Sequence, residues 1–160
     1  MFYIVVAALM FVLPLLSIAT EAATAHVAIG AGLACKWFVF WAMGWRLLLA
    51  GLRQIVQPAF TARVILGLKH DESHLLVREL GFANVAMGLL GVLSLPMPGW
   101  RMAAALAGGV FYALAGAAHV RQPHRNRLEN VAMVSDLFVA AVLLGSCAAI
   151  LSHAWNPEAR

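Results

Sequence analysis

Two arginines stand inside an apolar stretch of the sequence, where a guanidinium is suited to binding an anionic or carbonyl-bearing group. Arg46 interrupts the apolar run from Trp37 to Leu52, and Arg53 follows seven residues later. Because seven residues make about two helical turns, the two side chains share one helical face. An arginine at membrane depth costs at least about 2.5 kcal/mol, so it persists only beside a partner, in the protein interior or in a wet cavity. We therefore expect Arg46 to belong to a functional site.

Four further polar residues are expected in the same, cytoplasmic half of the bundle as the two arginines, from their distance to the helix ends at a rise of about 1.5 Å per residue. They are Glu79, Asn84, His119 and Asp136. The sequence thus predicts one polar cluster, with Arg46–Asp136 and Arg53–Glu79 as the expected ion pairs. One interpretation is that buried ion pairs hold the helices in register. The other is that the cluster binds a polar head group, with Asp136 or His119 serving proton transfer.

Other combinations of residues carry weaker signals. His70 and His74 would share a helical face and could bind a metal, but Asp71 stands where the HExxH motif has glutamate, so a solvated polar face is favoured. Cys35 and Cys147 fall toward the same side of the membrane, where packing and a disulfide are the alternatives. We recognise no glycine-rich phosphate loop and no Ser-His-Asp arrangement. No catalytic residue and no metal site are predicted, and a role other than an enzyme is favoured.

The elements that must position these residues are membrane-spanning helices. Of the 160 residues, 63% are hydrophobic and only 11% are charged. A core of this size cannot hide so much apolar surface, so lipid must cover it. Backbone groups in lipid must be satisfied within each segment, which predicts an all-α polytopic bundle in a single domain, residues 1–160. The expected helices lie near residues 2–19, 37–55, 80–95, 101–118 and 131–151, and the third is short enough to require polar ends or a kink.

Proline and glycine mark the expected boundaries. Pro58 should end the second helix, and the turn at residues 96–99 should make the third and fourth helices antiparallel neighbours. Residues 58–77 suggest a short amphipathic helix on the membrane surface, whereas residues 20–36 fit a loop, a re-entrant piece or a helical extension. Small residues recur on the third and fourth helices, which predicts close helix packing. These residues are Gly81, Gly88, Gly91, Ala105, Gly109, Ala113 and Ala117.

Positive charge sorts the loops into two sides. The richer side holds Arg53, Arg63, Lys69, Arg78, Arg121, Arg125 and Arg127, and the poorer side holds Lys36, Arg101 and Arg160. This bias predicts a cytoplasmic N-terminus and a periplasmic C-terminus in a bacterial inner membrane. The basic residues form no aromatic-interleaved soluble face, so nucleic acid is not an expected partner.

The segment from Val77 to Leu90, VRELGFANVAMGLL, resembles the third-helix region of DoxX-like small bacterial membrane proteins. The lead-in from Phe60 to Leu68 and the late Asp136 also fit that pattern. The resemblance implies a four-helix core over the second to fifth helices, to which the first helix would be an addition. It further implies relatives that include membrane subunits of quinone-linked oxidoreductases, partners of redox enzymes and assembly chaperones.

Three functions follow as expectations. The first is a non-catalytic membrane subunit or assembly factor that associates with a larger membrane complex, which could be a redox complex. Its support is the abundance of small-residue helix faces. The second is a quinone- or lipid-binding redox component that uses the polar cluster as its head-group site. The third is a small transporter, which would need to be a homo-oligomer. No cofactor is assigned beyond a bound quinone or lipid.

Overall fold

The computed structural model describes residues 2–68 and 70–155, and within them the chain is all α-helical, with no strand. The N-terminal helical elements are α1 (Phe2–Ala7), η1 (Ala8–Val12), α2 (Leu13–Ala25), α3 (Ala31–Phe38), η2 (Val39–Trp45) and α4 (Arg46–Val56). The remaining elements are η3 (Phe60–Ile65), α5 (Ser73–Leu93), η4 (Pro98–Trp100), α6 (Arg101–Arg121) and α7 (Arg127–Trp155). The predicted all-α bundle is confirmed. Lys69 and Arg160, which entered the predicted charge bias, lie outside the described residues.

Within the described residues, five helical rods are long and apolar enough to cross a membrane, as predicted, but each is longer than expected. They are Tyr3–Ala25, Ala31–Val56, Ser73–Leu93, Pro98–Arg121 and Arg127–Trp155. The third is not short. Its charged first turns, which the sequence analysis assigned to a loop, continue the helix beyond its apolar part. Residues 20–36, left open from the sequence, hold the end of α2, a break with His26 in the left-handed region and the start of α3.

Two close helix pairs build the bundle. Helix α4, with η2 before it, packs along α5, and α6 packs along α7. A β-carbon placed on Gly91 of α5 would lie 2.6 Å from the Cα of Gly44, so the two backbones touch. The predicted small-residue packing of the third helix is therefore confirmed. On α6, a β-carbon placed on Gly109 or Gly116 would meet a leucine side chain of α7, at 2.8 Å and 2.6 Å respectively.

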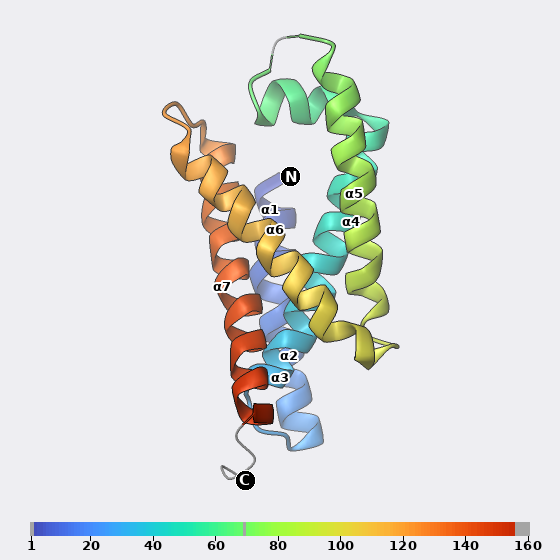
Figure 1. The fold of residues 1–160 in the computed structure, drawn as a ribbon, viewed down its shortest axis with the longest axis vertical. Helices are drawn as coiled ribbons and strands as arrows, with labels where there is room; N and C mark the ends of the chain where they lie inside the picture. The colour runs from blue at the N-terminus through green and yellow to red at the C-terminus, as the bar shows by residue number, and fades with distance from the viewer. Residues whose placement is uncertain (1, 69, 156–160) are drawn as a thin grey trace.

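The α4/α5 and α6/α7 pairs diverge toward the end of the molecule that holds η3 (Figure 1). The turn at residues 96–99 forms as predicted, with η4 in it, but α5 and α6 separate beyond it instead of packing along their length. Helices α1 and α2 fill part of the space between the pairs, with Val6, Met10 and Ile18 buried in the common core. The first rod is thus an integral part of the bundle.

Wide π-helical turns interrupt the first two rods. Segment η1 ends at Val12, two residues before Pro14. This proline lacks an amide hydrogen and its ring crowds the preceding turn, so a wider turn relieves that contact. Segment η2 immediately precedes Arg46, and the Tyr112 hydroxyl donates a 2.6 Å hydrogen bond to the carbonyl of Ala42 within it. Such turns are rare and recur at functional sites.

The connection between α4 and α5 differs from the predicted surface helix over residues 58–77. Pro58 ends α4 as expected, because the residue before a proline avoids the helical region. The helix that follows is the single short segment η3, and Gly67 ends it with a φ of 66°. Of its apolar residues, Phe60 and Ile65 face a pocket in the bundle, while Val64 is exposed. The segment therefore covers the bundle end as well as presenting a surface.

Candidate functional site

A cavity of about 330 Å³ lies between the two helix pairs at the end covered by η3. Its walls come from α1, α4, η3, α5, α6 and α7. Five of the six residues of the predicted polar cluster line this cavity: Arg46, Arg53, Asn84, His119 and Asp136. Residues from four separate rods of the chain thus meet at one site, as their estimated depths in the membrane predicted.

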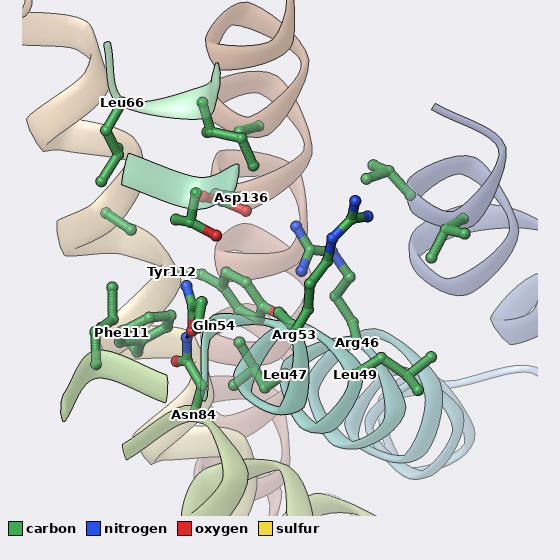
Figure 2. A pocket seen from close by; sticks show the side chains of 18 of the residues that line it. Arg46, Leu47, Leu49, Arg53, Gln54, Leu66, Asn84, Phe111, Tyr112 and Asp136 are labelled. Carbon is green, nitrogen blue, oxygen red and sulfur yellow. Dashed lines mark hydrogen bonds between the residues drawn. The ribbon is translucent and has the colours of Figure 1, made fainter. Parts of the chain in front are cut away.

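The two arginines extend from α4 to the same side of that helix (Figure 2). Arg46 is half-buried, and its Nε atom is buried without a hydrogen-bond partner in the protein. Arg53 is more exposed, and its guanidinium carbon lies 3.7 Å from the centre of the Phe60 ring of η3, a cation–π contact. Both guanidinium groups therefore keep N–H donors that no carboxylate of the described chain occupies.

A hydrogen-bonded pair of amides stands in the same wall (Figure 2). Asn84 of α5 donates from Nδ2 to Oε1 of Gln54 on α4, with 2.8 Å between the atoms. Only 4% of Asn84 and 8% of Gln54 is exposed. The Oδ1 atom of Asn84 is buried and has no hydrogen-bond partner among the described residues, so its capacity to accept a hydrogen bond is unused.

Asp136 and His119 complete the polar lining. Asp136 of α7 is 7% exposed, and its carboxylate accepts no hydrogen bond from the described residues, although it is close enough to Arg46 for their charges to attract. His119 of α6 has a buried Nδ1 atom without a partner in the protein. Tyr112, fully buried beside them, uses its hydroxyl on the η2 backbone.

Two of the predicted details are wrong. Among the described residues, neither Arg46–Asp136 nor Arg53–Glu79 forms an ion pair. Glu79 is exposed on α5 and does not line the cavity. The reason is helical geometry: Glu79 precedes Asn84 by five residues, which turns it by about 140° to another face of the helix at 3.6 residues per turn. The cluster is thus a lined cavity with separated charges and not a set of closed ion pairs.

Several lining residues were not predicted from the sequence. Gln54 and Thr61 are polar and buried, and Val5, Val6 and Phe60 supply apolar wall. Gln54 could have been found as a polar residue next to Arg53 within an apolar helix. The valines of α1 carry no distinguishing signal, because any apolar residue of a membrane helix resembles them.

A second polar group lies at the opposite end of the bundle. Glu21 of α2 accepts hydrogen bonds from the Lys36 ammonium and, at 2.7 Å, from the Trp37 indole. These groups satisfy one another and join α2 to α3. Cys35 and Cys147 are both buried free thiols, which fits the packing alternative and not the disulfide.

His70 lies in the connection before α5 and His74 lies in the first turn of that helix, so the two histidines do not share a helical face as predicted. His74 lies 3.8 Å from the carboxylate of Asp71, which Arg63 also contacts. No group of three or more metal-ligating side chains occurs in residues 2–68 and 70–155.

Residues 1–158 match the model of a family described as "Family of unknown function (DUF6790)". No curated protein and no solved structure matches the chain.

Proposed function

The chain belongs to the DUF6790 family, and from its site we propose that it is a membrane protein that binds the polar head group of an amphiphile between its two helix pairs. The observation that carries this proposal is the grouping of unsatisfied polar atoms. Arg46 Nε, Asn84 Oδ1 and His119 Nδ1 are all buried without a hydrogen-bond partner among residues 2–68 and 70–155, and all three residues line the same cavity. Buried polar atoms are almost always hydrogen-bonded. A ligand with both donors and acceptors would satisfy these three.

The apolar part of the lining favours an amphiphile over a fully polar solute. Leu47, Phe111 and Ile65 line the cavity beside the polar groups. Leu49 and Leu80 also line it, and they are 44% and 38% exposed on the outer faces of α4 and α5. A cavity bounded by such residues adjoins the face that lipid would cover, so an acyl or isoprenoid tail has a route out of the bundle.

The other sequence-based expectations stay proposals. The expected redox component would bind a quinone or a lipid. The DoxX-like resemblance supports the quinone. Association with a larger membrane complex is compatible with head-group binding, since an accessory subunit can hold a lipid or a quinone for its partner. A homo-oligomeric transporter is the least supported, because it needs a second access route.

We place the protein in a bacterial inner membrane with the cavity end in the cytoplasm. The support is charge at that end of the bundle: Arg63 lies in η3, Arg78 in the first turns of α5 and Arg125 between α6 and α7. The head group would then belong to a molecule of the cytoplasmic leaflet.

Mass spectrometry of the protein purified in mild detergent tests the proposal. Wild-type protein should retain an amphiphile in stoichiometric amount, and Arg46→Ala and Arg53→Gln should lose it. Arg101→Gln is the matched control, because Arg101 also has a buried Nε without a partner but does not line the cavity. Equal amphiphile content in all four proteins would refute the proposal. The same spectra report any stoichiometric protein partner, which bears on the accessory role.

A further inference from the structure

Building on the proposed function, we infer that the head group is a singly charged phosphodiester that carries free hydroxyl groups, the chemistry of a phosphatidylglycerol head. The inference rests on three features of the cavity. These are its charge balance, the directions in which its polar groups can form hydrogen bonds, and the position of its apolar wall.

Charge balance favours an anion with one negative charge. In formal charges, Arg46 and Arg53 bring two positive charges to the cavity and the Asp136 carboxylate brings one negative charge, which leaves an excess of one positive charge. An uncompensated charge is unfavourable in a site of low polarity. A phosphodiester, with one negative charge, neutralises the cavity. A zwitterionic head group leaves the excess in place.

Hydrogen-bond direction requires a ligand that both accepts and donates. The two guanidinium groups only donate, and their planar forks match phosphate oxygens. A carboxylate at Asp136 only accepts when it is ionised, and Oδ1 of Asn84, which has no partner among the described residues, is likewise an acceptor. A quinone or a simple carboxylate would serve the arginines but would offer these two acceptors nothing. Hydroxyl groups beside a phosphodiester serve both sets.

Size and the apolar wall favour a membrane lipid as the source of this head group. The cavity of about 330 Å³ lies near the lower end of the range for ligand pockets, about 300–1,000 Å³, which suits a head group and not a whole lipid. Leu49 and Leu80, exposed on the bundle surface and lining the cavity, would contact the first part of the acyl chains. A soluble glycerophosphodiester would gain nothing from them.

Native mass spectrometry of delipidated protein tests the inference with matched probes. The lipids are dioleoyl phosphatidylglycerol, dioleoyl phosphatidylmethanol and dioleoyl phosphatidylethanolamine. Phosphatidylmethanol keeps the single negative charge but lacks hydroxyls, while phosphatidylethanolamine has no net charge. We expect phosphatidylglycerol to bind about tenfold more tightly than phosphatidylmethanol, the usual effect of one hydrogen bond to a charged group. Phosphatidylethanolamine should also bind more weakly than phosphatidylglycerol, because it does not neutralise the excess positive charge of the cavity. Free glycerophosphoglycerol should compete poorly.

Two variants assign the effects to residues. Arg53→Gln, at an exposed position where folding should tolerate it, should weaken phosphatidylglycerol binding about tenfold, and Arg101→Gln should leave it unchanged. Asp136→Asn should reduce the preference for phosphatidylglycerol over phosphatidylmethanol, because the amide no longer requires a donor. Each variant is first checked for a monodisperse elution profile and a wild-type melting temperature, and Arg53→Gln suffices if Asp136→Asn fails to fold.

Equal binding of phosphatidylglycerol and phosphatidylmethanol would overturn the hydroxyl requirement, and a preference for phosphatidylethanolamine would overturn the charge argument. Competition by glycerophosphoglycerol at the concentration of the lipid would assign the site to a soluble ligand. If purified protein retains a quinone and binds none of the three lipids, the inference fails while the proposed function stands. If it retains no amphiphile at all, both fail.

Discussion

The Asn84 side chain donates a 2.8 Å hydrogen bond to Gln54, and this contact joins α5 to α4 in the wall of the cavity. The bond uses the amide nitrogen of Asn84 and leaves its oxygen buried without a partner in the protein. One asparagine therefore has two roles: its nitrogen fixes the position of α5 relative to α4, and its oxygen is available to a ligand. The two roles can be separated by mutation.

Substituting both amides should be less harmful than the single changes suggest. Asn84→Leu leaves Gln54 buried without its partner, and Gln54→Leu does the same to Asn84, so each should lower the free energy of unfolding by about 1 kcal/mol. In Gln54→Leu/Asn84→Leu no amide remains unsatisfied, and the loss should be smaller than the sum. Thermal unfolding in detergent provides the four values for a double-mutant cycle. Strictly additive losses would mean that the bond contributes no coupling.

Helix contact between α4 and α5 should depend on individual glycines. Gly91→Ala would place a methyl group against the Gly44 backbone, at 2.6 Å from its Cα, which backbone atoms cannot avoid by rotating. We expect a loss of about 1–3 kcal/mol of stability, as for overpacking in other cores. Gly145→Ala is the matched control, because nothing lies within 4 Å of the added carbon. Similar melting temperatures for the two variants would contradict this packing.

The sequence predicted the composition of the site better than its geometry. Spacing alone placed Arg46 and Arg53 on one face, and depth alone brought Asn84, His119 and Asp136 to the same level. Both depend on regular helical geometry, which a sequence pattern reports. Glu79 was misassigned because depth says nothing about which face of α5 is turned inward. That face is set by contacts between helices, here by glycines packed against η2 and α4.

The open cavity was beyond sequence reasoning for a related reason. Opposite charges at similar depth suggest ion pairs, but pairing depends on how far the helix pairs diverge. The divergence depends on α1, which lies between the two helix pairs, and on η3, which covers their end. Neither segment carries a charge pattern that predicts this position. The sequence analysis made the helices too short because the polar turns at Ser73–Arg78 and at Arg127–Asn130 look like loops in a hydropathy profile. The start of α7 does carry another signal, since Asn126 and Glu129 form a capping interaction there.

Segment η3 should lose order when its aromatic contact to α4 is removed. Phe60→Leu keeps most of the apolar volume but removes the ring that lies 3.7 Å from the Arg53 guanidinium carbon. A cation–π contact at such a position contributes about 0.5–1 kcal/mol, so amide hydrogen exchange over residues 58–68 should become a few-fold faster. Phe82→Leu, at an exposed phenylalanine on α5, is the control. An unchanged exchange rate in Phe60→Leu would indicate that other contacts hold η3.

Acid should loosen the connection between η3 and α5. The Arg63 guanidinium, hydrogen-bonded to Asp71, lowers the pKa of that carboxyl below its ordinary value of 3.8. A carboxylate whose pKa is lower in the folded state stabilises the folded connection at any pH above its ordinary, unfolded-state pKa. This stabilisation is lost as the pH falls from the ordinary pKa through the folded-state pKa. Hydrogen exchange over residues 63–74, corrected for its intrinsic pH dependence, should show lower protection below about pH 4 than at pH 6. Asp71→Asn should show the lower protection at both pH values, and because the pair is exposed the effect should be small.

The separation of Arg46 from Asp136 makes a quantitative prediction about coupling. A closed buried ion pair would make Arg46→Gln and Asp136→Asn each cost about 3–5 kcal/mol and the double variant much less than their sum. Since these side chains form no ion pair in the described structure, we expect a coupling energy below about 1 kcal/mol between the two changes. Unfolding of the four proteins after delipidation measures it directly. Repeating the cycle with added phosphatidylglycerol should raise the coupling, because a head group that contacts both residues links their effects. Strong coupling in the delipidated protein would instead identify a structural ion pair.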